Sequence, residues 1–532
     1  MTELFTHLPV VPVLLPLISA ALLLLLGDSR RRLKSVINIT ACGAGIVVAT
    51  MILMRVEETG QIGVYLASNW EAPVGIVLVA DRFAALMVLV TSIIGLCSAL
   101  YAEAAWSRVG VYFHPLFQVQ LMGLNGAFLT GDLFNLFVFF EVMLAASYGL
   151  QLHGSGVPRV RSGLHYIAVN LLASALFLIG LAVLYGVLGT LSMADIAAKL
   201  PFIPAQDRGL LHAGAAILAV AFLIKAAIWP LNAWLTRAYS AASAPVAALF
   251  AVMTKVGVYT LLRLWSLFFE TGPSAGFGQS VLFYGGLVTL AVGAIGLMTT
   301  VRIDRIAGYA ILVSSGTLLA SVGLDMVEVT SAALFYIVTA TFAVSALFLL
   351  VELVERIGLD RRPPIDDVIV PGEDTNLDDA ALPLVGRVYP VSIALLGLGF
   401  MFCTLLVAGL PPLSGFLAKL ALLTSVTSAH SAAAWVLFGL LLLASFTSLV
   451  SFARAGIKAL WARGARAAPD VQGAEAGAFL TLLLMCVLLT VFAEPVMRYT
   501  RAAAAQLHGR EAYIDTVLTT PARDRSGAEG TP

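Results

Sequence analysis

The chain has 532 residues, of which 60% are apolar and only 12% are charged, and its formal net charge at pH 7 is zero. An average soluble protein is about 25% charged, so this composition excludes an ordinary soluble domain and predicts a membrane protein with many spans. The neutral balance gives no indication of nucleic acid binding. The sequence contains no phosphate loop or dinucleotide fingerprint, and its seven histidines form no metal-spaced cluster, so we expect no cofactor and no metal.

Windows of about 20 apolar residues, the length that crosses a bilayer, recur along the whole chain. They predict an all-α integral membrane protein with about 14 transmembrane helices. The first run is not expected to be a cleaved signal peptide, because the basic cluster follows it. The predicted spans are residues 9–27, 36–54, 82–101, 113–130, 133–151, 164–188, 210–235, 244–268, 279–299, 303–323, 330–352, 390–424, 431–453 and 475–496.

The basic residues predict the orientation of these spans, because cytoplasmic loops carry an excess of Lys and Arg. If the basic cluster Arg30–Lys34 lies in the cytoplasm, both termini lie outside. The cytoplasmic loops then hold 18 of the 31 basic residues and the external loops hold four, while five lie in the C-terminal tail and four within spans.

Two of the predicted spans are interrupted, and each has a lysine close to the break. In the seventh span Lys225 precedes Pro230, and in the twelfth span Pro411 and Pro412 precede Lys419. A proline within a span removes a backbone hydrogen bond and leaves carbonyl groups free to bind water or ions. Paired breaks at matching positions are the sequence signature of inverted repeats around a midplane site.

The two breaks lie five spans apart, and an odd number of spans per unit reverses the second unit in the membrane. We therefore expect two inverted five-helix repeats between terminal segments. The predicted organisation is 1–105 for helices 1–3, 106–270 for the first repeat of helices 4–8, 271–455 for the second repeat of helices 9–13, and 456–532 for helix 14 and a polar tail.

Three ionisable residues in the first repeat lie deep in apolar spans. Glu141 is nine residues into the fifth span, and Lys225 and Lys255 lie in the seventh and eighth. Such residues are expensive in a bilayer and usually mark a charge pathway. A carboxylate and an amine in low dielectric have coupled proton occupancy, which a proton pump or antiporter requires. The alternative is a static ion pair that only holds helices together.

Other polar residues within spans have weaker functional signals. Lys419 is the counterpart of the first-repeat lysines, whereas Arg263 lies near the end of its span and is expected to extend to the interface. Ser314, Thr339 and Thr341 can hold water along a proton wire or can serve as small helix-packing residues.

Three further features concern the ends and connections of the spans. Asp132 is expected to cap the start of the fifth span. The polar insert Glu355–Tyr389 is interpreted as a solvated cytoplasmic connector, with a docking surface for a partner as the alternative. The tail after Arg498 is polar, and we expect it to be poorly ordered.

Five segments of the chain resemble one known family. They are LTGDLFNLFVFFEVMLAASYGL, VNLLASALFLIGLAVLYGVLGTLSMADIA, IKAAIWPLNAWLTRAY, APVAALFAVMTKVGVYTLLR and LPPLSGFLAKLALL. In this order they resemble the fifth, sixth, seventh, eighth and broken twelfth helices of the D-type component of Mrp-type, or Pha-type, multisubunit cation/proton antiporters. The antiporter-like subunits of respiratory complex I share this superfamily.

The resemblance implies roles for four residues. Glu141 and Lys225 would be the coupled pair, Lys255 the connecting lysine, and Lys419 the terminal lysine of the second half-channel. Pro230, Pro411 and Pro412 would form the helix breaks, with Arg263, Ser314, Thr339 and Thr341 in support.

The sequence departs from the family pattern at two places. The loop after the seventh span has Arg237 and Ser243 where the family usually shows proline. The eleventh span lacks the ionisable residue that relatives carry there. Water held by Thr339 and Thr341 would then have to bridge the two half-channels.

These observations predict a proton-translocating subunit of a multisubunit Na⁺ or K⁺/proton antiporter, a secondary transporter subunit and not an enzyme. Its partners would be the other Mrp or Pha subunits and membrane lipid, and its location the bacterial cytoplasmic membrane. One alternative is an antiporter-like pumping subunit of a complex I-like or hydrogenase redox complex. Another is a structural subunit whose charges only support assembly.

Overall fold

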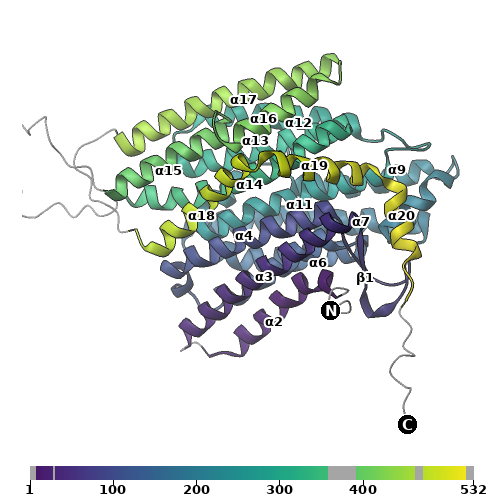
Figure 1. Ribbon diagram of the computed structural model, residues 1–532, viewed down its shortest axis with the longest axis horizontal. Helices are drawn as coiled ribbons and strands as arrows, with labels where there is room; N and C mark the ends of the chain where they lie inside the picture. Colours follow the sequence, from purple (N-terminus) through teal and green to yellow (C-terminus); the bar gives the residue numbers. More distant parts are fainter. Residues whose placement is uncertain (1–6, 28–29, 358–390, 462–470, 523–532) are drawn as a thin grey trace, which may run out of the picture.

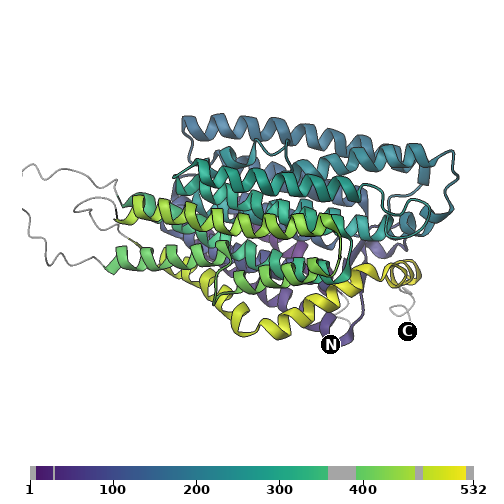
Figure 2. The ribbon, with the colours of Figure 1, turned by 90° about the horizontal axis from the view of Figure 1, so that it is seen from above.

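The computed structural model of the chain describes residues 7–27, 30–357, 391–461 and 471–522, and it forms a bundle of long helices that run side by side (Figures 1 and 2). The predicted connector at 355–389 lies almost entirely outside the described residues. The helices of the first half are α2 (Val11–Leu25), α3 (Arg31–Thr59), α4 (Arg82–Ala104), α5 (Phe113–Leu129), α6 (Leu133–Leu152), α7 (Val157–Leu188), α8 (Met193–Lys199), α9 (Arg208–Lys225), α10 (Leu235–Ala241) and α11 (Ala244–Phe268). Those of the second half are α12 (Gln279–Thr299), α13 (Ile303–Leu324), α14 (Val327–Arg356), α15 (Val391–Ala408), α16 (Ser414–Thr427), α17 (Ala432–Gly456), α18 (Gly473–Val491), α19 (Ala493–His508) and α20 (Arg510–Thr519).

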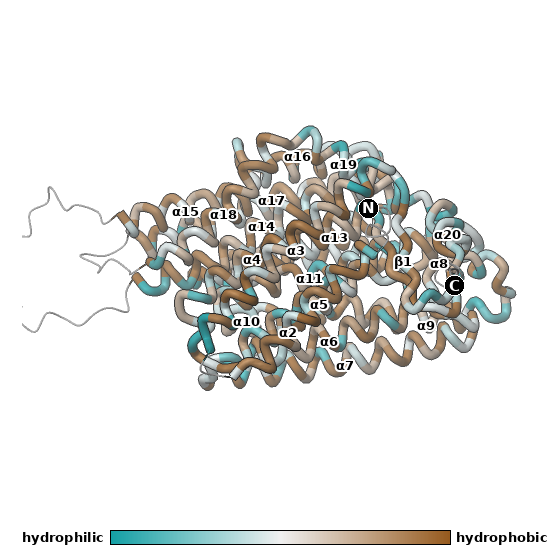
Figure 3. Tube along the Cα trace, turned by 60° about the horizontal axis from the view of Figure 1, so that its bottom comes forward, coloured by the Kyte–Doolittle hydropathy of each residue, from teal (hydrophilic) through white to brown (hydrophobic). Residues whose placement is uncertain are grey.

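The helices agree with the predicted membrane spans. Thirteen helices within the described ranges are long and apolar enough to cross a membrane. The predicted span 113–130 forms α5, a largely buried helix of 17 residues. Hydrophobic residues cover the length of the helices, and hydrophilic residues gather toward their ends (Figure 3). The prediction of an all-helical membrane protein is therefore confirmed.

Helix α11 is the centre of the bundle. All 25 of its residues are buried, and it packs against α4, α9, α13 and α14. A bilayer cannot satisfy the charge of a side chain such as Lys255, so the helix that carries this lysine is enclosed by protein. Helix α9, which ends at Lys225, and helix α13, which carries Ser314, thus pack directly against the helix of Lys255.

Both predicted helix breaks are present. Helix α9 ends at Lys225 and α10 begins at Leu235, whereas α15 ends at Ala408 and α16 begins at Ser414. Pro230 lies in the first break, and Pro411 and Pro412 lie in the second. Proline ends a helix because it has no backbone N–H to donate and its ring clashes with the preceding turn.

A short antiparallel ribbon at one end of the bundle was not predicted. Strands β1 (Gly63–Leu66) and β2 (Val77–Ala80) pair with Gly63 opposite Ala80. Backbone bonds continue beyond the ribbon: Gly131 N donates to Val77 O at 2.9 Å, and Met193 N donates to Gly131 O at 2.9 Å. We call the ribbon with the segments 130–132 and 191–193 the lid.

The lid lies at the end of the bundle where both described termini and α20 also lie (Figure 1). We call this the terminus-bearing end. Asp132, within the lid, caps α6 as predicted, because its carboxylate accepts a bond from Asn135 N at 2.8 Å.

The expectation of a poorly ordered tail after Arg498 is wrong for residues 499–522, and its last ten residues lie outside the described structure. Residues in this region form α19 and α20, and α19 packs against α14 and α4. Tyr499, Ala503 and Leu507 recur every four residues and are buried, while Arg501 on the other face is exposed. The segment is amphipathic, so its low mean hydropathy concealed one apolar face.

The end of α19 is fixed by a histidine outside the membrane spans. Nδ1 of His508 lies 2.9 Å from Oε1 of Glu270, and its Nε2 lies 3.2 Å from the hydroxyl of Thr330. Burial alone would lower the pKa of His508, but the hydrogen bond and charge of Glu270, with the charges of Asp325 and Glu328, raise the pKa above its usual value.

This raised pKa predicts that the C-terminal helices loosen at alkaline pH. The protonated imidazole stabilises the packing fully below its unfolded pKa of about 6.5, and this contribution is lost as pH rises through the folded pKa. We expect hydrogen-exchange protection factors in α19 and α20 to fall as the pH rises above about 6.5 and through the raised pKa of His508. In His508→Gln the protection should be low throughout this range. The same pH dependence in the variant and the native chain would contradict this role.

Candidate functional site

Helix α7 separates the predicted Glu141–Lys225 pair. Glu141 on α6 is half-buried, and its carboxylate accepts a bond from the hydroxyl of Ser174. Nζ of Lys225, the last residue of α9, donates to Oδ1 of Asn170 at 2.6 Å. No direct ion pair joins Glu141 to Lys225 in the described structure, although the carboxylate lies close enough to act on the ammonium electrostatically.

The α7 residues at this site were not found from the sequence. Tyr166, Asn170 and Ser174 are four residues apart and share one face of α7. Nδ2 of Asn170 donates to Tyr166 O at 2.7 Å, so its amide is oriented with the oxygen toward Lys225. The four-residue spacing of polar side chains in an apolar span was the available signal.

Lys255 on α11 is buried, and its Nζ donates to the hydroxyl of Ser314 on α13 at 2.7 Å. Close packing of α11 against the end of α9 brings the two lysine-bearing helices together at Gly257. A β-carbon at this position would lie 2.7 Å from the backbone nitrogen of Ala226 and 2.9 Å from Phe222 O. Only glycine permits this approach.

Lys419 on α16 binds the backbone freed by the second break. Its Nζ donates to Val407 O at 2.9 Å, Ala408 O at 3.0 Å and the hydroxyl of Ser445 at 2.9 Å. The last carbonyls of a helix have no intrahelical partner, and α15 ends here. Gly409, with φ +75°, makes the turn, and a β-carbon there would meet the Lys419 side chain at 2.5 Å.

A small cavity lies between the contacts of Lys255 and those of Lys419. Its volume is about 20 Å³, and Ser314, Thr339 and Val407 are among its lining residues. The hydroxyl of Thr339 is buried without a hydrogen-bond partner, whereas that of Thr341 donates to Ile337 O at 2.5 Å on its own helix. A site of roughly 10–15 Å³ accepts one water, so this cavity is large enough to hold one.

Arg263 does not extend to the interface as expected. It is buried, and it forms two bonds to the carboxylate of Asp81, from Nη1 to Oδ2 at 2.5 Å and from Nη2 to Oδ1 at 2.8 Å. Asp81 was not predicted as its partner, because the two residues are 182 positions apart in the sequence. The buried carboxylate removes the need for the guanidinium to reach water.

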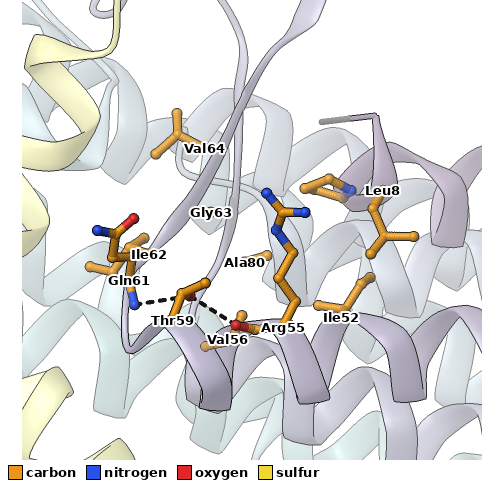
Figure 4. Close-up of a pocket in the computed structure, with 11 residues that line it drawn as sticks. Leu8, Ile52, Arg55, Val56, Thr59, Gln61, Ile62, Gly63, Val64 and Ala80 are labelled. Atoms are coloured by element: carbon orange, nitrogen blue, oxygen red, sulfur yellow. Dashed lines mark hydrogen bonds between the residues drawn. The ribbon is translucent and has the colours of Figure 1, made fainter. Parts of the chain in front are cut away.

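A hollow at the terminus-bearing end of the bundle is not part of this site. It has a volume of about 190 Å³ and lies between the turn before α2, the end of α3 and the ribbon (Figure 4). Leu8, Ile52, Arg55 and Thr59 line it, and none of the predicted site residues does.

Comparisons with known proteins identify the family. Residues 130–447 match the family described as NADH:quinone oxidoreductase/Mrp antiporter, transmembrane. The chain is 47% identical to the D component of a probable K(+)/H(+) antiporter of Rhizobium meliloti, with 99% of this chain and 100% of that one aligned. It is 33% identical to the D component of the Na(+)/H(+) antiporter of Bacillus subtilis, with 96% of this chain and 99% of the relative aligned.

Solved structures agree with this relationship. A chain of the Mrp complex from Dietzia sp. superposes with a TM-score of 0.82 at 27% identity, covering 97% of this chain and 100% of that one. A chain of respiratory complex I from Thermus thermophilus superposes with a TM-score of 0.74 at 22% identity, covering 96% and 100%, and this shows a shared fold.

The chain therefore belongs to the NADH:quinone oxidoreductase/Mrp antiporter family, and within it to the D-type components of Mrp antiporters. It is a multi-pass membrane component of a multisubunit cation/proton antiporter, and thus part of a transporter and not an enzyme. This confirms the antiporter prediction over the redox-complex alternative.

Proposed function

We propose that this protein carries the proton limb of the exchange through Glu141, Lys225, Lys255 and Lys419. The observation that supports it is that the three buried lysines donate hydrogen bonds only to neutral oxygen atoms in the described structure. Lys225 donates to an amide oxygen and Lys255 to a hydroxyl. Lys419 donates to two backbone carbonyls and a hydroxyl. Such an amine can release its proton without leaving an unpaired carboxylate in low dielectric, so it can alternate between two protonation states.

The two helix breaks then serve two half-channels, in the inverted repeats 106–270 and 271–455. Protons enter each half through polar groups at a break and meet at the centre of the bundle. Water beside Thr339 links Ser314 to the second half. We propose that both termini face outward across a bacterial cytoplasmic membrane, that the other antiporter subunits surround this chain, and that the complex expels Na⁺ or K⁺, the ions in its relatives' names.

Replacing Lys255 or Lys419 tests the pathway. We expect Lys255→Ala and Lys419→Ala complexes to assemble but to lose most cation-driven proton exchange. The assay uses inverted vesicles that carry the whole complex and follows collapse of a respiration-generated pH gradient when Na⁺ or K⁺ is added. Lys199→Ala is the control, because the side chain of this lysine is 47% exposed and is not part of the proposed pathway. Native exchange in both central variants would refute the pathway, and the responding cation identifies the substrate.

The single unsatisfied hydroxyl in the central cavity gives a finer test. We expect Thr339→Val, which keeps the shape but removes the hydroxyl, to slow exchange by about tenfold, or about 1.4 kcal/mol on the barrier. Thr341→Val is the control, because that hydroxyl already bonds its own helix. Equal rates in the two variants would contradict a bridging role for Thr339.

A further inference from the structure

Buried polar atoms without a hydrogen-bond partner surround the lysine-bearing part of α11, but they are absent from the described side chains of Asp81, Tyr259 and Arg263. In native structures such buried atoms mark where water binds. Tyr148, Ser315, Thr339 and Ser414, on helices around the central lysines, each have a buried hydroxyl without a partner, and Ser243 at the start of α11 has another. At the far end of α11, Ser192 of the lid and Glu270 each have one such atom, whereas the network of Arg263 and Tyr259 with Asp81 has none.

The residues at that far end satisfy one another. Arg263 donates to both carboxylate oxygens of Asp81, and its Nη2 donates to the hydroxyl of Tyr259 at 2.9 Å. That hydroxyl donates to Phe128 O at 2.5 Å. Asp81 Oδ1 also accepts from Ala84 N at 2.8 Å, which caps α4.

Aromatic rings and the lid cover this network. The guanidinium of Arg263 lies 5.2 Å from the ring of Tyr259 and 5.8 Å from the ring of Tyr513 on α20. Phe83 packs against Tyr259 at a centroid distance of 4.5 Å. A β-carbon at Gly131 of the lid would lie 2.8 Å from Val79 and 3.4 Å from the hydroxyl of Tyr513, so the cover is closely packed.

Such a network cannot pass a proton. The guanidinium of Arg263 does not lose its proton in proteins. The carboxylate of Asp81 is occupied by two donors from Arg263 and one from the backbone. Lys255 lies eight residues earlier on the same helix, which is about 12 Å away at 1.5 Å per residue.

We propose that the Arg263–Asp81 pair is an insulating seal that stops protons at Lys255 from leaving along α11 toward the terminus-bearing end. This inference rests on the proposed proton path through Lys255. The seal leaves a proton at Lys255 only the proposed route through Ser314 and the central cavity toward Lys419. A proton then crosses the membrane only together with cation exchange. It assigns Asp81 and Arg263 a role in coupling, although neither carries the transported proton.

The test measures proton leak in the absence of any exchangeable cation. Inverted vesicles with the complete complex are energised by respiration in choline buffer, respiration is then stopped, and the decay of the pH gradient is recorded. The double variant Asp81→Asn with Arg263→Gln removes both charges of the pair, so no buried charge is left without a counterion. We expect its gradient to decay several-fold faster than that of the native complex. The charge swap Asp81→Arg with Arg263→Asp restores the pair and should restore slow decay.

A neighbouring ion pair that is more exposed provides the control. Arg82 lies 3.0 Å from Glu57, whose side chain is 46% exposed, and Arg82→Gln with Glu57→Gln should leave the leak unchanged. Native decay in an assembled Asp81→Asn, Arg263→Gln complex would overturn the proposal. If that complex does not assemble, the single variant Tyr513→Ala is used instead, because it removes the ring that covers the guanidinium of Arg263. Faster decay of the pH gradient in this variant supports the seal, and decay at the native rate overturns it.

A further variant separates this inference from the proposed pathway. Adding Lys255→Ala to the leaking double variant should restore slow decay if the leaking proton passes through Lys255. A persistent leak would show that the seal is a barrier but that the route does not include Lys255. Loss of exchange in the Lys255→Ala and Lys419→Ala complexes tests the pathway independently of the leak.

Discussion

Replacing Lys225 or Glu141 with alanine is expected to reduce cation-driven proton exchange below about a tenth of the native rate, while the complex still assembles. Lys225 is the end of α9 at the first break, and it is held by the amide of Asn170 within electrostatic reach of Glu141. If one of the two residues is removed, the protonation of the remaining one is no longer coupled to a partner. The inverted-vesicle assay measures the rate, and a native gel measures assembly.

A substitution of Asn170 gives a second test of the coupled pair, and a substitution of Ser174 gives its control. Asn170→Asp places a carboxylate 2.6 Å from where the lysine ammonium lies, and the resulting ion pair should hold Lys225 charged and also stop exchange. Ser174→Ala removes only one hydrogen bond to Glu141 and should leave most activity. Full activity in both Lys225→Ala and Glu141→Ala would reject the coupled pair, and loss of the complex would favour a structural role.

Replacing Asp81 alone should have the largest effect on stability. In Asp81→Ala the guanidinium of Arg263 remains buried without a counterion, which costs about 3–5 kcal/mol. We expect little assembled complex in the membrane and a lower melting temperature for what can be purified. Glu57→Ala, which breaks the neighbouring pair between Arg82 and the exposed side chain of Glu57, should cost no more than about 1 kcal/mol. Equal losses in the two variants would contradict the importance of the buried pair.

The sequence predicts the spans and the breaks well because the bilayer imposes strong rules. Every backbone group in lipid needs an internal partner, so long apolar runs become helices. Proline at Pro230 and Pro412 interrupts such helices for a local reason. The intramembrane lysines are also visible, because a charge within an apolar run is rare.

The remaining features depend on packing between distant segments. Asn170 and Ser174 are neutral and inconspicuous in an apolar span, and only the fold brings them to Lys225 and Glu141. Helix α19 was missed because a mean over about twenty residues hides an apolar stripe on a polar helix. The lid depends on backbone bonds between Val77, Gly131 and Met193, which no local pattern predicts.

The central cavity has a consequence for selectivity. At about 20 Å³ it admits one water and has no room for Na⁺ or K⁺ with even part of its hydration shell. On the proposed path a proton would cross this junction on a single water molecule, whereas a partly hydrated metal ion would not fit. A continuous column of water at this place would let both species through and dissipate the gradient. On the proposed path the cation must cross elsewhere in the complex, and the narrowness of this junction keeps the two ions on separate routes.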